Sequence, residues 1–386
     1  MGEKRLESSR EYSVSLHRHA GVRPIGTMST SSALPMDPDC ISPGWLTGAL
    51  RERFPAAAVV SVEVLEVRHG TNSHARLRLE HAVDCGLPEV AFLKLPPQDP
   101  SRREAVNKTG MGRREALFYR TLADRVPMRV PCPYVARFEE ASGSFVLLIE
   151  DLDTAGCTIP DTVAALSFEQ AVLAMGDYAA LHVRYEDDEI RAREAGWVDR
   201  MPRGSDFGTT LLQYGLDHHR DRLTDAFAEL AGLYIEKQSA LEEVWERGSV
   251  TVLQGDSHIG NLFEDHGRPG FLDWGLIHLG SPLRDVGYFI CMALSPANRR
   301  KHERELLERY LEARRELGGE PIGFDEAWLL HRVHAAYNVP ASCPTVTFPE
   351  NAIPAQARTS AAFLERAECA IEDLEARAAL REVAGI

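Results

Sequence analysis

The chain has 386 residues, of which 44% are hydrophobic, and its formal net charge at pH 7 is −15. This length suffices for two or three domains or for one two-lobed enzyme with a substantial core. The acidic balance argues against nucleic-acid or anionic-membrane partners, because both require clustered basic residues. No apolar run approaches the roughly 18 residues that span a bilayer.

The N-terminal residues and the cysteines indicate where the chain is ordered and in which compartment it works. Residues 1–40 mix Ser, Arg and His with little hydrophobic periodicity, so we expect a disordered leader. The seven cysteines are scattered and odd in number, which predicts reduced thiols and a cytoplasmic location. The first helix is predicted from Ser42-Pro43, an N-cap followed by a helix-starting proline, to residue 54.

From residue 59 the apolar period becomes that of β-strands, with strands predicted over residues 59–67 and 75–79. Loops between strands can bind phosphate through backbone N–H groups. The loop here contains a single glycine, Gly70, so a plain hairpin turn explains it as well. In a phosphate-binding loop, hydrogen bonds from Asn72 or Ser73 would replace the missing glycines.

The next strand, residues 90–95, is apolar except for Lys94. A lysine inside an apolar strand costs free energy unless it has a partner. The helical spacing of residues 113–125 supplies Glu115, and Glu104 is a second candidate. Alternatively, Lys94 lies at a sheet edge and its amine reaches water.

A further hairpin is predicted over residues 134–149, ending in Glu150-Asp151-Leu152, and a linker follows over residues 153–162. Beyond the linker, Ser167 and Gln170 form a capping box before a helix. The acidic run at residues 187–189 is either a solvated face or a contact for a cationic substrate. Further helical segments are predicted over residues 206–247, 299–317, 324–337 and 354–380.

The chemistry-bearing side chains lie in residues 250–288. A short strand stops at Gly255, so Asp256 sits on a tight loop before a second strand that begins near Asn261. A third strand ends at Asp273. Phosphoryl transfer needs this set of groups: a carboxylate to orient and deprotonate the attacking hydroxyl, and oxygen ligands for Mg²⁺.

Asp256 and Asn261 have four residues between them, as in a kinase catalytic loop, and Asp273-Trp274-Gly275 stands where kinases carry Asp-Phe-Gly. Residues 255–261 and 272–274 resemble the signature of the aminoglycoside phosphotransferase and choline kinase superfamily, which consists of small-molecule kinases with the protein-kinase fold. The chain departs from the family pattern at Gln254, where His is usual. A glutamine can keep a hydrogen bond in this loop. The resemblance covers about residue 42 to the last helices.

The resemblance implies an α+β, bilobal protein-kinase-like fold. Its N-terminal antiparallel-sheet lobe would occupy residues 41–152, and its larger, mainly helical lobe residues 153–386. It also implies dependence on ATP and Mg²⁺ and a small-molecule hydroxyl acceptor. An aminoglycoside, amino alcohol, sterol, macrolide or sugar would each fit this class.

The resemblance further implies a role for each site residue. Asp256 is the base or orienting carboxylate, and Asp285 anchors its loop. Asn261 and Asp273 are the metal ligands. The remaining residues would bind the nucleotide: Lys94 and Glu115 as the phosphate clamp, Gly70, Asn72 and Ser73 in the phosphate loop, and Glu150 and Leu152 at the hinge that reads adenine.

Two other functions stay open at this stage. Gly-Asp-Ser also opens the nucleophile block of one class of serine esterase, which would make Ser257 the nucleophile, although no Asp-x-x-His follows it. A pseudokinase that binds nucleotide without transferring phosphate is the second alternative. The complete set of Asp256, Asn261 and Asp273 argues against it, whereas Gln254 and the single-glycine loop leave it open. A protein acceptor is disfavoured, because no Ala-Pro-Glu follows Asp273 and the gap to Asp285 is short.

Overall fold

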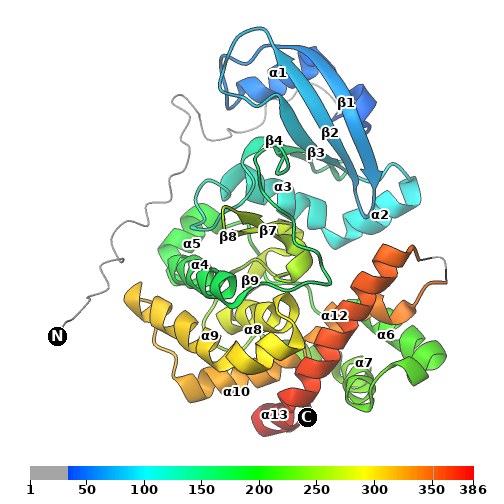
Figure 1. The fold of residues 1–386 in the computed structure, drawn as a ribbon, viewed down its shortest axis with the longest axis vertical. Helices are drawn as coiled ribbons and strands as arrows, with labels where there is room; N and C mark the ends of the chain where they lie inside the picture. The colour runs from blue at the N-terminus through cyan, green and yellow to red at the C-terminus, as the bar shows by residue number, and fades with distance from the viewer. Residues whose placement is uncertain (1–33, 351) are drawn as a thin grey trace.

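The computed structural model describes residues 34–350 and 352–386. Two parts are evident: a sheet with three flanking helices, and a larger helical part beneath it (Figure 1). This is the expected α+β, bilobal arrangement. The predicted leader lies outside the described residues except for residues 34–40, where Pro38–Cys40 form a 3-10 helix.

The upper part is an antiparallel sheet of five strands in the order β1-β2-β3-β5-β4. Its strands are β1 (Val59–His69), β2 (Ser73–His81), β3 (Val90–Leu95), β4 (Pro133–Glu139) and β5 (Ser144–Glu150). Its helices are α1 (Pro43–Arg51), α2 (Pro100–Thr109) and α3 (Met111–Thr121). Because successive side chains of a strand point to opposite faces, Leu148 packs toward α1, whereas Leu147 packs toward α3.

The lower part packs its helices around two apolar clusters. Its helices are α4 (Phe168–Glu186), α5 (Asp188–Ala195), α6 (Asp206–His219), α7 (Asp225–Trp245), α8 (Pro282–Ala293), α9 (Pro296–Glu316), α10 (Phe324–Ala335), α11 (Asn338–Ala341), α12 (Pro354–Asp373) and α13 (Ala376–Ala384). Helix α8 is buried along almost its whole length and therefore forms the centre of this part. Within residues 34–350 and 352–386, no helix is both long and apolar enough to cross a membrane.

Two short antiparallel strand pairs carry the chemistry-bearing segment. Strand β6 (Thr251–Leu253) pairs with β9 (His278–Gly280), and β7 (Leu262–Asp265) pairs with β8 (Arg268–Phe271). The three strands predicted for this segment are thereby confirmed. The loop between β6 and β7 and the loop between β8 and β9 emerge together beneath the sheet, which brings Asp256, Asn261 and Asp273 into one region.

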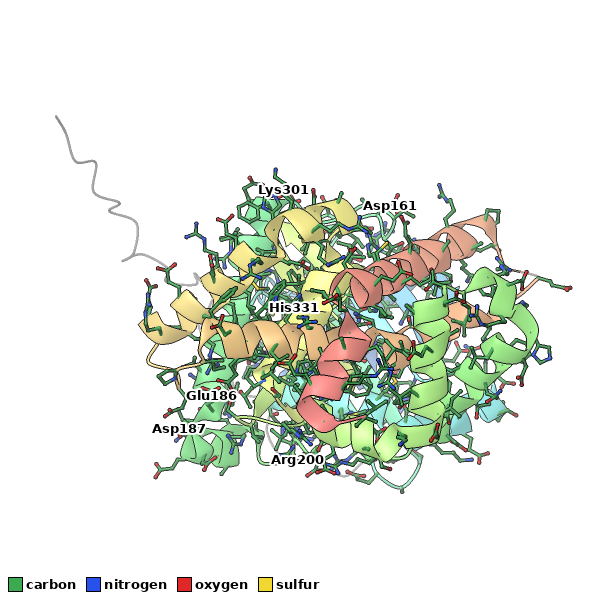
Figure 2. All side chains as sticks on the ribbon, turned by 90° about the horizontal axis from the view of Figure 1, so that it is seen from below. Asp161, Glu186, Asp187, Arg200, Lys301 and His331 are labelled. Atoms are coloured by element: carbon green, nitrogen blue, oxygen red, sulfur yellow. The ribbon has the colours of Figure 1, made fainter. Side chains whose placement is uncertain are left out.

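Two long helical predictions are interrupted in the structure. Residues 206–247 form two α-helices, and Thr224 caps the second by accepting a hydrogen bond from the Phe227 N–H. The helix predicted over residues 354–380 breaks at Glu375, where φ is 47°. The acidic run at residues 187–189 is exposed, and Asp187 caps α5 at the outer edge of the molecule (Figure 2).

Candidate active site

The loop that carries Asp256 is held from below by a buried carboxylate. Asp285, on α8, accepts hydrogen bonds from the backbone N–H groups of Gln254 at 2.7 Å and Gly255 at 2.9 Å. Gly255 has φ 86°, and a Cβ there would lie 2.2 Å from the Leu276 carbonyl oxygen. The turn therefore requires glycine, and it directs Asp256 toward the junction of the two parts.

Asp256 and Asn261 are in direct contact. The Asn261 side-chain N–H₂ donates to Asp256 Oδ2 at 2.8 Å and to the Asp256 carbonyl oxygen at 3.0 Å. This use of the amide nitrogen leaves the amide oxygen of Asn261 on the other side, available to a cation. Burial raises the pKa of Asp256, and the negative charge of Asp273 acts in the same direction.

Gln254 joins the loop of Asp256 to that of Asp273. Its Oε1 accepts hydrogen bonds from the Asp256 N–H at 2.7 Å and from the Ser257 hydroxyl at 3.3 Å. Its Nε2 donates to the carbonyl oxygens of Leu272 at 2.9 Å and Asp273 at 3.1 Å. With 1% of its surface exposed, this glutamine is a structural bridge between the two loops.

Lys94 reaches the same region from the sheet. Its Nζ lies 2.7 Å from Glu115 Oε2, on α3, and 3.6 Å from Asp273 Oδ2. Glu104 instead lies on α2, where its exposed carboxylate contacts Lys108 at 2.8 Å. Glu115 is therefore the partner of Lys94.

The pKa values of Lys94, Glu115 and Asp273 reflect one cation that is shared by two carboxylates. Burial alone would lower the pKa of Lys94, but the charges of Asp273 and Glu115 outweigh burial and raise the pKa above its usual value. Burial raises the pKa of Glu115 to about 7. The pKa of Asp273 is lowered despite burial, chiefly by Lys94. Lys94 and Asp273 are thus a charged pair at the centre of the site.

Contacts around Trp274 couple α3 to Asp273. The Trp274 ring is fully buried and stacks on Phe118, with ring centres 3.9 Å apart and planes 4° from parallel. Arg114 Nε donates to the Gly275 carbonyl oxygen at 2.8 Å. Since Glu115 lies on the same helix, movement of α3 would displace both Glu115 and the Asp273 loop.

The predicted phosphate loop is a tight turn between β1 and β2. The Gly70 N–H donates to the Asn72 carbonyl oxygen at 2.9 Å, and Ser73, already part of β2, lies 3.3 Å from His69 Nδ1 through its hydroxyl. Asn72 is 7% exposed, and among the described residues its side-chain oxygen has no hydrogen-bond partner. The role of this turn stays a prediction.

Sequence reasoning missed His74, which pairs across the sheet with Lys94. Burial and the positive charge of Lys94 lower the pKa of His74 to about 4, so the ring is neutral near pH 7. Its place beside a loop of polar residues was visible in the sequence. Its pairing with Lys94 depends on the strand register, which the sequence left open.

At the predicted hinge, the acidic side chains are engaged with arginines. Glu150 accepts two hydrogen bonds from Arg129, each 2.8 Å long, and Arg129 also contacts Asp265 at 2.6 Å. Asp151 accepts hydrogen bonds from Arg76 at 2.6 and 2.8 Å. Leu152 follows with a partly exposed side chain. Any contact of Glu150 with a base therefore falls to its backbone.

The position of Ser257 differs from that of a nucleophile in a hydrolase. Its side chain is fully buried, and its hydroxyl donates to Gln254 Oε1. A nucleophile must reach its substrate and face a general base. The geometry gives the esterase alternative no accessible nucleophile.

The described residues contain no group of three or more His, Cys, Asp or Glu side chains that could hold a metal ion. A Mg²⁺ site in a kinase uses one or two protein oxygens and completes its coordination with phosphates and water. The Asp273 side chain, 38% exposed, and the amide oxygen of Asn261 fit this smaller donor set.

Fold and site together define a bilobal protein with a kinase-like fold. The sequence profile of the phosphotransferase enzyme family matches residues 70–328. The chain therefore belongs to this family. A search of curated proteins finds no match.

Solved structures similar to the chain include a choline kinase and a choline/ethanolamine kinase family protein. A choline kinase from Cryptosporidium parvum Iowa II is 12% identical, with a TM-score of 0.50, and the match covers 83% of this chain and 91% of that one. A choline/ethanolamine kinase family protein from Mesorhizobium loti is 15% identical, with a TM-score of 0.46 and coverage of 84% and 93%. At 12% identity, the similarity to the choline kinase shows that the two proteins share a fold.

Proposed function

We propose that this protein is an ATP- and Mg²⁺-dependent kinase that phosphorylates a hydroxyl group of a small molecule. Membership of the phosphotransferase enzyme family makes it a phosphotransferase by class. One observation supports the more specific proposal of an ATP- and Mg²⁺-dependent kinase. Four side chains converge on one region between the two parts: Lys94, Asp273, Asn261 and Asp256.

In the proposed reaction, Asp256 accepts the proton of the acceptor hydroxyl as its oxygen bonds to the γ-phosphorus. The bond from that phosphorus to the β–γ bridging oxygen breaks, and ADP leaves. Asp256 suits this step because burial raises its pKa while one of its oxygens, Oδ2, is oriented by Asn261.

Lys94, held by Glu115, would bind the α- and β-phosphates. Asp273 and Asn261 would hold Mg²⁺, which neutralises charge that develops on the phosphates. Gly70, Asn72 and Ser73 would cover the phosphates, and the backbone of Glu150 and Leu152 would meet the base. We place the activity in the cytoplasm, as the scattered cysteines predict.

An acceptor screen tests the proposal. Purified protein with Mg·ATP is offered aminoglycosides, amino alcohols, sterols, macrolides and sugars, and ADP formation is followed with a coupled assay. We expect at least one acceptor to stimulate ADP formation and to yield a phosphate ester visible by ³¹P NMR. Asp256→Asn should abolish the stimulation. Nucleotide binding without transfer to any acceptor would instead favour the pseudokinase.

A further inference from the structure

The second oxygen of Asp256 faces a histidine from its own loop. His258 Nε2 lies 3.6 Å from Asp256 Oδ1, and the two side chains are 19% and 24% exposed. This separation is slightly longer than a hydrogen bond, as is common at catalytic groups before substrate binds. Asn261 occupies Oδ2, so protein groups flank both oxygens of the carboxylate.

The tautomer of His258 follows from its other nitrogen. Nδ1 accepts a hydrogen bond from the Gly260 N–H at 3.1 Å and thereby caps the short 3-10 helix Ile259–Asn261. A nitrogen that accepts a hydrogen bond carries no proton, so the proton of the neutral ring is on Nε2, facing Asp256. His258 therefore cannot take a proton from Asp256 at Nε2.

Aromatic neighbours restrict the ring of His258. Phe363, on α12, meets it edge to face with ring centres 4.8 Å apart, and Tyr288, on α8, lies 6.4 Å away. Such edge contacts disfavour rotation of the ring. The helix near the C-terminus is thus connected to the catalytic loop through His258.

We propose that His258 is a positioning residue that directs its Nε2–H at Asp256 Oδ1 and fixes the plane of that carboxylate for the acceptor hydroxyl. The inference rests on the proposed function of Asp256. With Asn261 alone, the carboxylate would keep one oriented oxygen and could turn about the bond to its Cβ. With both donors, the oxygen lone pairs stay directed at the reacting hydroxyl.

Two substitutions separate this role from the helix cap. His258→Asn places an amide oxygen near the position of Nδ1, so it keeps the cap and loses the donor toward Asp256. His258→Gln places its amide nitrogen near the position of Nε2, so it keeps the donor and loses the cap. A positioning role and a purely structural role therefore predict opposite orders for the two variants.

The first experiment measures single-turnover loss of γ-phosphate from labelled Mg·ATP, with water as acceptor or with any acceptor from the screen. We expect His258→Asn to lower the rate about 10- to 100-fold, the usual effect of losing a hydrogen bond to a charged group. His258→Gln should stay within a few-fold of wild type, although its Tm is the lower of the two. Affinity for a fluorescent ATP analogue should not change. The reverse order of rates, or equal rates, would overturn the inference.

The second experiment does not depend on turnover. Selective ¹⁵N-histidine labelling, with His258→Gln to assign the signal, should show Nε2 protonated and Nδ1 unprotonated. The Nε2 signal should shift in Asp256→Ala. A protonated Nδ1, or no shift, would refute the contact. If wild type loses no γ-phosphate under any condition, the proposed function fails, and the NMR result still decides whether His258 orients Asp256.

Discussion

Replacing Gln254 tests whether one buried side chain holds the two catalytic loops together. Gln254→Met keeps the length of the side chain and removes all four of its hydrogen bonds, whereas Gln254→Ala also removes volume. In either variant the backbone N–H of Asp256 and the carbonyl oxygens of Leu272 and Asp273 lose their partner.

The expected cost follows from these three backbone groups. A buried polar group left without a partner costs about 1–3 kcal/mol, and water entering the gap lowers this cost. We therefore expect Gln254→Met to lose about 3–5 kcal/mol of unfolding free energy, with a somewhat larger loss for Gln254→Ala. Since the loops would separate, the rate of phosphoryl transfer should fall in both variants.

Urea unfolding followed by circular dichroism measures the stability, and an ADP-coupled assay measures the rate. Gln254→His is the matched control, because histidine is the usual family residue and can bond to at least one of the same backbone groups. It should keep more stability and more activity than Gln254→Met. A loss below about 1 kcal/mol in Gln254→Met would refute the bridging role, since three orphaned backbone groups cannot cost so little.

Three further substitutions test Lys94, Trp274 and Asp177, a buried carboxylate on α4. Lys94→Met should weaken binding of a fluorescent ATP analogue. Without the charge of Lys94, the pKa of Glu115 should rise above its wild-type value of about 7, so stability relative to wild type should fall as pH rises above about 7 in urea titrations. Burial raises the pKa of Asp177 to about 7, so folding takes up a proton there. Relative to Asp177→Asn, wild type should lose up to about 4 kcal/mol as pH rises from 4 to 7, and parallel pH profiles would contradict this. Trp274→Ala removes the stack on Phe118 and should cost about 3–5 kcal/mol in the same unfolding assay.

The fold was predictable where the sequence pattern is local. Apolar alternation predicted the strands, and one lysine within an apolar strand indicated a buried partner. Two acidic residues were available, and Glu115 is the partner because α3 packs under the sheet while α2 leaves Glu104 in solvent. That choice depends on the packing of two helices, which spacing along the chain does not encode.

The contacts that complete the site depend on backbone geometry. The φ of 86° at Gly255, the left-handed Asp273 with φ 47°, and the contact of His258 with Asp256 arise only when the loops fold against each other and against α3 and α8. From the sequence, Gln254 was a departure from the family pattern that can keep a hydrogen bond. In the structure it makes four. Sequence spacing indicates which residues meet, and packing decides how they are oriented.

Rapid-quench measurement of γ-phosphate loss from labelled Mg·ATP, in wild type and in Asp256→Ala, tests the central claim most directly. A parallel titration with a fluorescent ATP analogue reports nucleotide affinity. We predict transfer by wild type, a rate at least about 100-fold lower in Asp256→Ala, and nearly equal nucleotide affinities. Equal rates in the two proteins, or no transfer by wild type with nucleotide bound, would contradict the account.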